Sequence, residues 1–253
     1  MVNAAAVLPV VAACLTAVAS VGVAAWPASG FARAYVDGLE RAVENQDQED
    51  SADAATATAR IRFQRLLDPL PQGALATLLC AVTLVWGLGH GAVVDTALAL
   101  PVVALLGVAG SVDAVCHRLP NRLLVTAALW LLAVMAIRAL GNMVLIAPSA
   151  AEPWTVGRAV LCALGAGAAI LAMWLIPASG MGLGDVKLCA LLGLWLGYIA
   201  VEWVVTGLIL GFILAGLMAI GLLLTRRAGR KDKLAFGPYL AAGGWLAWLL
   251  AVA

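Results

Sequence analysis

Charged side chains are scarce in this chain of 253 residues, in which Asp, Glu, Lys and Arg together account for only 11%. A soluble domain carries about 25% charged residues. Hydrophobic residues instead make up 64% of the chain, and its mean hydropathy is +1.03. This composition excludes an ordinary soluble domain and indicates an integral membrane protein. Because the formal net charge is only +1, we expect no nucleic-acid partner.

Histidine and paired cysteine are lacking as well. The two histidines, His90 and His117, form no H-E-x-x-H motif, and no two cysteines are spaced as C-x-x-C. The sequence therefore predicts no metal site, no redox pair and no cofactor. We interpret all five cysteines as small packing residues, since four of them lie in apolar runs. They are Cys14, Cys80, Cys116, Cys162 and Cys189.

Apolar residues gather in eight segments, most of which approach the roughly 20 residues that a helix needs to cross a membrane. The pattern predicts an all-α, polytopic fold with about eight transmembrane helices. The second and sixth segments are short, and we expect them to be tilted or extended by ordered ends. The segments lie near Ala4–Pro27, Gly73–Leu88, Thr96–Val112, Leu123–Leu140, Trp154–Ile176, Val186–Ile199, Trp203–Leu224 and Phe236–Val252.

Positive charge is distributed unequally between the two sides of the membrane. If the chain crosses eight times, thirteen of the fifteen Lys and Arg residues fall on one side, and only Arg138 and Arg158 fall on the other. Because cytoplasmic loops carry the excess of positive charge, the thirteen are expected to face the cytoplasm and both termini to face out. The sequence thus predicts a multi-pass protein of the cytoplasmic (inner) membrane.

The polar stretch Ala28–Gln72 separates the first apolar segment from the others. We expect residues 1–27 to form the first transmembrane helix, residues 28–72 a short cytoplasmic helical hairpin, and residues 73–253 a seven-helix domain. The first segment could also be a cleaved signal peptide, but no Lys or Arg precedes it, which favours a retained helix. The hairpin is expected only to position its neighbours.

Two aspartates stand where apolar segments meet water, although carboxylates are rare in membrane segments and usually functional there. Asp185 lies in the run G-L-G-D-V-K of residues 182–187, just before the sixth segment. It could be a helix N-cap, worth about 1 kcal/mol, or a catalytic residue, and the run alone does not decide. Asp113 ends the third segment, and the charge pattern places it on the same face at similar depth. That coincidence favours a catalytic pair.

Two carboxylates that share a proton can hydrolyse a peptide bond without a metal or a covalent nucleophile. The ionised one takes a proton from water, while the protonated one polarises the carbonyl and later donates to the leaving amine. Asp185 opens a helix, whose positive end favours an ionised carboxylate, and Asp113 closes one, whose negative end favours the protonated form. We therefore assign the base to Asp185 and the acid to Asp113. His117 is expected to be an interfacial loop residue, since no G-x-S-x-G elbow accompanies it.

Three short blocks follow one another along the chain. Pro-Asn follows Asp113 at a distance of seven and eight residues, G-x-G-D-x-K surrounds Asp185, and L-A-F-G-P-Y-L-A occupies residues 234–241. In this order the blocks resemble the motifs of the type IV prepilin peptidase family of intramembrane aspartic peptidases. The resemblance implies that Asp113 and Asp185 are the catalytic pair. The supporting motif positions are Pro120, Asn121, Gly182, Gly184, Lys187, Phe236, Gly237 and Pro238.

Some of these supporting positions also have plainer interpretations. Lys187 is expected to be a cytoplasmic anchor, because side chains two positions apart on a helix do not face each other and it would not reach Asp185. Gly237 and Pro238 could merely start a helix, or they could hold the last segment near the active site, and both interpretations stay open here.

The resemblance also implies a substrate and a compartment. Members of the family cut the leader peptides of prepilins at the cytoplasmic membrane face, so the expected partners are the lipid bilayer and the helix of a prepilin or pseudopilin. Such substrates serve type IV pili, tight-adherence pili or protein secretion. Many members also carry a large loop with two C-x-x-C pairs and N-methylate the new terminus. Because residues 28–72 contain no cysteine, the chain resembles a short form from which no N-methyltransferase activity is expected.

Two other functions are alternatives to a prepilin peptidase. A transporter or proton-relay protein could use the same carboxylates, but it is expected to hold them near mid-membrane rather than at the interfaces. A different G-x-G-D intramembrane protease would place its first aspartate after Tyr and carry a Pro-Ala-Leu block, and the sequence has neither.

Overall fold

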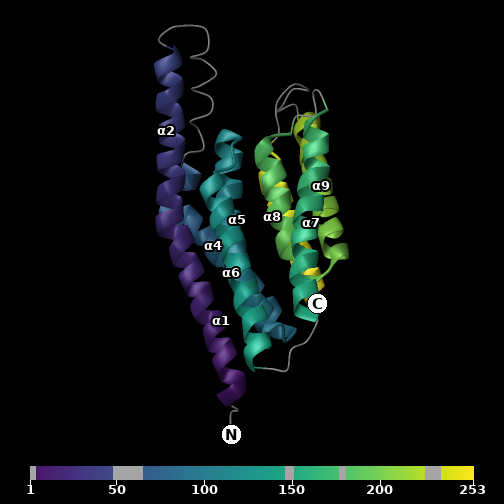
Figure 1. Ribbon diagram of the computed structural model, residues 1–253. Helices are drawn as coiled ribbons and strands as arrows, with labels where there is room; N and C mark the ends of the chain where they lie inside the picture. The colour runs from purple at the N-terminus through teal and green to yellow at the C-terminus, as the bar shows by residue number, and fades with distance from the viewer. Residues whose placement is uncertain (1–3, 48–64, 146–150, 177–180, 226–234) are drawn as a thin grey trace.

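The computed structural model describes residues 4–47, 65–145, 151–176, 181–225 and 235–253, and within these ranges the chain forms helices and no strands (Figure 1). Each of the eight apolar segments is helical over most of its length, and the first one spans α1 and η1. The helices are α1 (Ala4–Val23), η1 (Ala24–Ala28), α2 (Ser29–Asp47), α4 (Pro69–Gly89), α5 (Val93–Cys116), α6 (Asn121–Leu145), α7 (Ala151–Trp174), α8 (Leu183–Ile199), α9 (Val201–Leu224) and α10 (Gly237–Ala251).

Six helical stretches in the described ranges are long and apolar enough to cross a membrane. The prediction of an all-α polytopic membrane protein is therefore confirmed. The helices α8 and α10 are shorter, with 17 and 15 residues, so the number of eight crossings and the side on which the termini lie stay predictions. The second segment is longer than expected, since α4 starts at Pro69, a residue well suited to a first helical turn, and has 21 residues.

The first helix does not end where the polar stretch begins. At Pro27 the chain makes a single π-helical turn, η1, and continues directly into α2. Pro27 has no backbone N–H to donate, which accounts for the change in hydrogen bonding at this point. Figure 1 shows α2 reaching past the other helices at the end of the bundle opposite the N-terminus. Part of the helical hairpin predicted over residues 28–72 falls outside the described residues, and the division into three domains stays a prediction.

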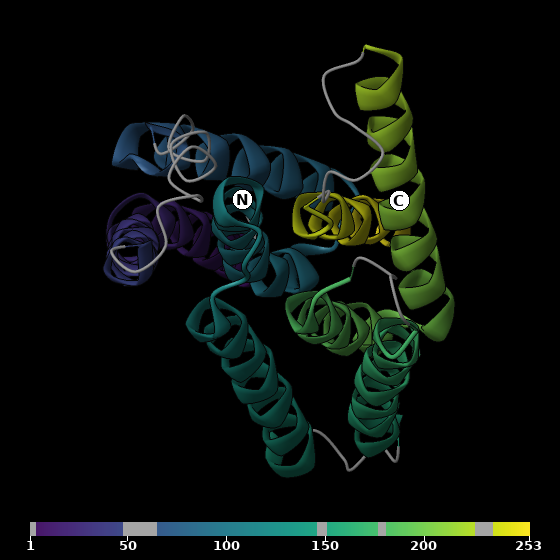
Figure 2. The same ribbon diagram turned by 90° about the horizontal axis from the view of Figure 1, so that it is seen from above.

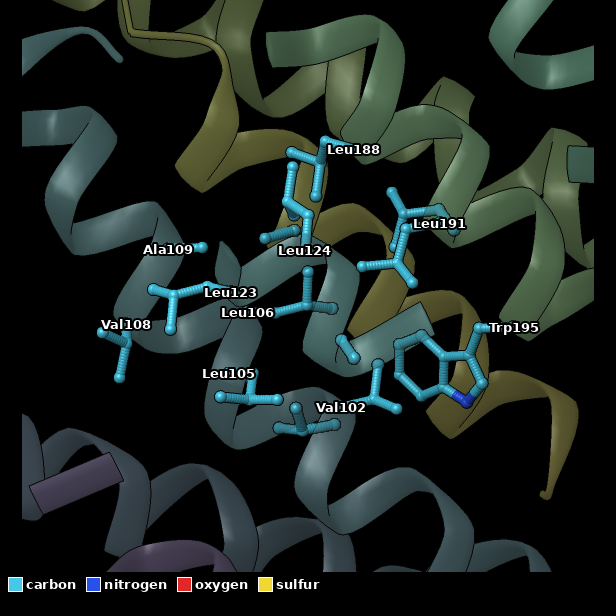
Figure 3. Packing of buried hydrophobic residues seen from close by; sticks show 14 of the residues in the cluster. Val102, Leu105, Leu106, Val108, Ala109, Leu123, Leu124, Leu188, Leu191 and Trp195 are labelled. Carbon is cyan, nitrogen blue, oxygen red and sulfur yellow. The ribbon is translucent and has the colours of Figure 1, made fainter. Parts of the chain in front are cut away.

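The interior of the bundle is built around α5, α8 and α10, which lie innermost when the molecule is seen from above (Figure 2). The helix α10 packs against both α5 and α8, as does α6. Leucine, valine and alanine side chains from α5, α6 and α8 meet Trp195 in one cluster, of which Figure 3 shows the central part. The helices that carry the two aspartates are thus held in place by shared neighbours rather than by each other.

Small residues allow the closest helix contacts, as expected inside a membrane where hydrophobic burial against lipid gives little driving force. Gly243 of α10 packs against the backbone of Gly207 and Gly211 on α9. Gly193 of α8 faces the backbone of Cys162 on α7, where an added Cβ would lie 2.5 Å from the carbonyl oxygen. These contacts hold α10 closely against α9, and α8 closely against α7.

The two arginines that depart from the charge asymmetry both have structural partners. Arg138 forms an ion pair with Asp95 at 3.0 Å. Arg158 donates hydrogen bonds to the carbonyls of the last turn of α8, from Nε to Gly197 at 2.9 Å and from Nη2 to Tyr198 and Ile199 at 2.7 and 2.6 Å. A cation at this position satisfies carbonyls that the helix end leaves unpaired.

Replacing Arg158 by methionine is expected to lower the free energy of unfolding by about 2 kcal/mol, because hydrogen bonds from a charged donor are lost and the carbonyls stay half-buried. Thermal unfolding in detergent would measure the loss. Arg158→Lys keeps the charge but not the planar fork of donors, and we expect an intermediate effect. Unfolding of Arg158→Met at the wild-type temperature would contradict this role.

Candidate active site

The two aspartates meet at one end of the bundle. Asp113 lies in the last turn of α5 and Asp185 in the first turn of α8, and their residues are only 5% and 7% exposed. Both carboxylates line one cavity of about 430 Å³ and are close enough to interact electrostatically. The cavity is formed by ends of α5, α6, α8 and α10 together with α2. The structure thus brings together the pair that the sequence motifs pointed to.

Asp113 is held by the start of α10. The backbone N–H of Gly237 donates to Asp113 Oδ2 at 2.9 Å. The approach is so close that a Cβ at position 237 would lie 2.6 Å from Oδ2 and 2.9 Å from Cγ of Asp113. Gly237 is the first residue of α10 and also contacts Asp113, so both features of the two open interpretations occur together. Pro238 supports the same contact, since its Cα would lie 3.3 Å from a Cβ built on Gly110 of α5.

Asp185 is held by its own loop. The backbone N–H of Gly182 donates to Asp185 Oδ2 at 3.0 Å, and the N–H of Asp185 donates back to the carbonyl of Gly182 at 3.0 Å. The N-cap of α8 is therefore Gly182 and not Asp185, which is the third residue of the helix and bonds back to the N-cap as in a capping box. The carboxylate that makes this bond also lines the cavity, so capping and a place in the site occur together.

Of the two glycines in the G-L-G-D run, only Gly184 lies in a contact that requires a small residue. Gly182 has an extended backbone with φ of −101°, and a Cβ there would lie no closer than 3.8 Å to Asp185 Oδ2. Gly184 faces Leu119, whose Cβ would lie 3.0 Å from a Cβ built on it. Because Leu119 is buried directly before Pro120, Gly184 allows the loop after α5 to approach the start of α8.

Lys187 connects two of the predicted motifs. Its Nζ donates to Oδ1 of Asn121, the first residue of α6, at 2.8 Å. The sequence analysis expected an anchoring role for Lys187, and the structure gives it this specific contact. Asn121 also lines the cavity, whereas Pro120 is buried beside it. The Pro-Asn pair thus lies at the start of α6 next to the aspartates, and the hydrogen bond from Lys187 connects it to α8.

His117 ends α5 in an unusual backbone conformation. Its φ of 53° makes it the one residue other than glycine with positive φ among the described residues. Its N–H donates to the carbonyl of Asp113 at 2.8 Å, which closes the helix. Glycine usually takes such a position, because a side chain there costs energy. His117 is exposed and lines the cavity, so it is closer to the aspartates than an ordinary interfacial loop residue would be.

Sequence reasoning missed several residues that line the same cavity. Phe236 was found through its motif. Tyr35 was not found, because it comes from the segment assigned only a positioning role and belongs to no motif. Its helix-like spacing in an amphipathic stretch was the only available signal. The other residues that were not singled out for the site are Arg118, Leu119, Met181, Leu183 and Ala235.

The described residues contain no cluster of three His, Cys, Asp or Glu side chains that could hold a metal ion. What the site offers is a pair of carboxylates, each accepting one backbone N–H, in a cavity lined by apolar and polar side chains. Such a pair can hold one proton between two oxygen acids and pass it to and from a bound substrate.

The fold and the site define a class: the chain is a polytopic helical membrane protein with two buried aspartates in a cavity at the ends of its helices. Part of its sequence is similar to curated proteins named prepilin leader peptidase/N-methyltransferase. The match to the protein from Aeromonas hydrophila is 42% identical over 94 residues. Those from Pseudomonas putida and Burkholderia pseudomallei are 43% and 48% identical over 70 and 67 residues. These similarities agree with the resemblance of the three sequence blocks to the type IV prepilin peptidase family.

The similarity covers only part of each protein. The Aeromonas hydrophila match takes in 34% of this chain and 31% of the relative, and the Pseudomonas putida match takes in 28% and 23%. The Burkholderia pseudomallei match takes in 26% and 20%. The chain thus matches about a third or less of the length of these relatives. No family model and no solved structure matches the chain.

Proposed function

We propose that the chain is a membrane-embedded aspartic endopeptidase that removes the leader peptide of a type IV prepilin or pseudopilin at the cytoplasmic membrane face. One observation carries the proposal: Asp113 and Asp185, from separate helices, line one cavity and are each fixed by a backbone N–H, at 2.9 and 3.0 Å. The partial similarity to prepilin leader peptidases supplies the substrate class.

The proposed reaction uses one proton shared by the two carboxylates. Asp185, ionised at the positive end of α8, takes a proton from a water molecule as the oxygen attacks the scissile carbonyl carbon. Asp113, protonated at the negative end of α5, donates its proton to the carbonyl oxygen. As the intermediate collapses, the proton on the former carbonyl oxygen returns to Asp113, and Asp113 donates it to the leaving nitrogen while the C–N bond breaks. Asp185 then passes the proton that it took from water to Asp113, which restores the resting pair.

The location at the cytoplasmic face follows from the charges near the site. Arg118 and Arg122 flank the start of α6, and Lys187 lies in the first turns of α8. Concentrations of Lys and Arg favour the cytoplasmic side of a bacterial inner membrane. The opposite end of the bundle holds Arg138 and Arg158, and the partners of both belong to the protein itself.

We propose a peptidase without methyl transfer, although the similar proteins carry both activities in their names. The support for this narrower function is the distribution of cysteine, which is absent between Ala28 and Gln72 and nowhere spaced as C-x-x-C. The alternative of a transporter or proton relay gains no support from the site, because both carboxylates lie in terminal helical turns rather than along a path through the bundle.

Co-expression with each candidate prepilin of the same genome tests this function. We expect a mature pilin that is shorter by its leader, with an unmethylated first residue in mass spectrometry. A methylated terminus would contradict the peptidase-only form. Failure of the wild-type protein to process any of these prepilins would overturn the proposed function and favour the alternative of a transporter or proton-relay protein.

A further inference from the structure

The first helical stretch contributes directly to the cavity that holds the two aspartates. Tyr35 of α2 is half-buried and lines that cavity together with Asp113 and Asp185. It lies 78 residues before Asp113 in the sequence, so only the fold brings it there. None of the motifs, and nothing in the proposed reaction, gives Tyr35 a function.

Contacts on both sides of α2 place Tyr35 at the cavity. The ring of Phe31, one helical turn earlier, stacks on the ring of Tyr35 with centroids 6.1 Å apart. The guanidinium of Arg122, next to Asn121 at the start of α6, lies 5.6 Å from the centroid of Phe31. A cation over an aromatic face is attractive. The pair of rings is therefore attached to the helix that forms another wall of the site.

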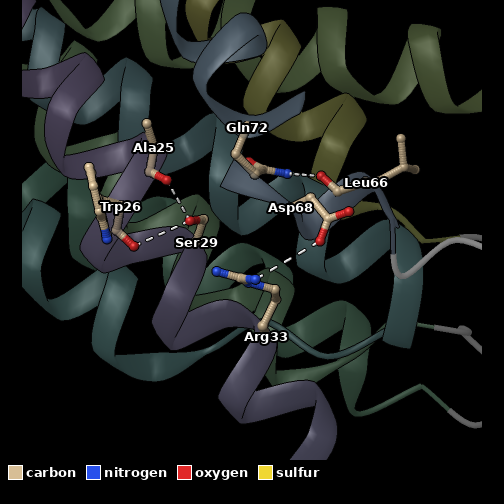
Figure 4. Close-up of polar contacts among 7 residues, drawn as sticks. All are labelled: Ala25, Trp26, Ser29, Arg33, Leu66, Asp68 and Gln72. Atoms are coloured by element: carbon tan, nitrogen blue, oxygen red, sulfur yellow. Dashed lines mark hydrogen bonds and ion pairs between the residues drawn. The ribbon is translucent and has the colours of Figure 1, made fainter. Parts of the chain in front are cut away.

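The other side of α2 is attached to the start of α4. Arg33 lies 4.0 Å from Asp68, the residue directly before α4 (Figure 4). Gln72, in the first turn of α4, donates to the carbonyl of Leu66 at 2.6 Å and so closes the turn that presents Asp68. Arg122 and Arg33 thus connect α2 to the starts of α6 and α4, beside the contact that α2 makes with α5.

Tyr35 also lies at the depth where a membrane-anchored substrate would reach water. The apolar helical stretch Val7–Leu39 has 33 residues, which corresponds to about 50 Å of helix, against a hydrocarbon thickness of about 30 Å. Trp26, 82% exposed and just before α2, is a residue type that favours the membrane interface. A membrane interface at Trp26 would leave the following turns of α2, with Tyr35, beyond the hydrocarbon.

We propose that Tyr35 is a substrate-contacting residue, whose hydroxyl donates a hydrogen bond to a backbone carbonyl of the substrate next to the scissile bond. The substrate class is an extended peptide segment joined to a membrane helix. This inference rests on the proposed function and deepens it, because it assigns part of the substrate site to residues 28–72. In this proposal the ring of Tyr35 and the ring of Phe236, which also lines the cavity, bound the space for the peptide.

Steady-state kinetics with purified protein and a prepilin peptide test the contact. Tyr35→Phe removes only the hydroxyl, and we expect KM to rise about fivefold to tenfold, while kcat changes less than twofold. Tyr35→Ala is expected to raise KM further. Asp37→Asn is the matched control, because Asp37 is exposed on the same helix outside the cavity, and it should keep both constants.

A photoreactive benzophenone side chain at position 35, in an Asp113→Asn background, gives a second readout that does not depend on turnover. We expect a covalent product with the prepilin at the residues around the cleavage site, and none from the same group at position 37. Unchanged KM in Tyr35→Phe and Tyr35→Ala would overturn the inference, as would equal cross-linking from both positions. If wild type cleaves a prepilin, these outcomes leave the proposed function intact; if wild type cleaves none, it is the proposed function that fails.

Discussion

Asparagine in place of either Asp113 or Asp185 is expected to reduce leader-peptide cleavage by about 10⁴-fold, the upper end of what acid–base catalysis contributes. Each substitution removes the exchange of a proton but almost none of the volume. An amide oxygen can still accept the backbone N–H of Gly237 or Gly182, so both variants should fold. The measurement is processing of a prepilin in membranes, with the amount of enzyme determined on the same samples.

The matched control for this experiment is Asp37→Asn, which makes the same replacement of a carboxylate oxygen by an amide group at an exposed position on α2. It is expected to process the prepilin as wild type does. Continued processing by either active-site variant would defeat the pair as the catalytic unit. A loss in the Asp37→Asn variant would show instead that any carboxylate near this end of the bundle affects processing.

The two variants also separate the acid from the base. Carboxyl bands in difference infrared spectra at neutral pH should show a protonated Asp113, and the band should disappear in Asp113→Asn while it persists in Asp185→Asn. The physical reason is the opposite sign of the two helix ends at which the residues lie. Finding the proton on Asp185 in the wild type would reverse the assignment of roles.

Alanine in place of Gly237 is expected to reduce cleavage by about 100-fold, because a displacement of roughly 1 Å at a reacting group costs that much. The new Cβ would lie 2.6 Å from Oδ2 of Asp113. Either the start of α10 or the carboxylate must therefore move. The backbone N–H that holds Asp113 stays in the chain, so the expected loss comes from geometry and not from a missing donor.

Gly182→Ala is the matched comparison. Gly182 also donates its N–H to an aspartate of the pair, but a Cβ there would lie 3.8 Å from Asp185 Oδ2, an ordinary contact distance. We expect cleavage within a few-fold of wild type. The test is the difference between the two alanine variants in the same processing assay. Equal losses would show that both positions depend on glycine for another reason, and full activity of both would remove α10 from the site.

Much of the fold could be read from composition and pattern. All eight apolar segments are helical over most of their length, since long apolar runs must satisfy their backbone hydrogen bonds internally in a membrane. The continuity of α1 with α2 was missed. Polar residues after Pro27 suggested a break, but a π turn absorbs the missing N–H and the helix continues. The residues around Pro27 do not indicate by themselves whether the helix ends there or continues through a π turn.

The two aspartates of the candidate site could be predicted from the sequence, whereas Tyr35 could not. Asp113 and Asp185 could be identified because carboxylates are costly in a membrane and occur there for a purpose. The depth of both could be estimated from the positions of Arg and Lys. Tyr35 could not be found in this way, because a tyrosine on an amphipathic helix is common and nothing local distinguishes it.

The sequence by itself determined which residues are expensive to place in a membrane and in what order they occur along the chain. From this followed an all-α membrane protein with an aspartate pair near one face. Only the tertiary structure decided that Gly237 and not Gly182 tolerates no side chain, that Lys187 reaches Asn121, and that α2 forms a wall of the cavity. Each of these depends on the distance between atoms far apart in the chain. Such distances arise from the packing of α5, α6, α8 and α10 as a whole, which no single segment specifies.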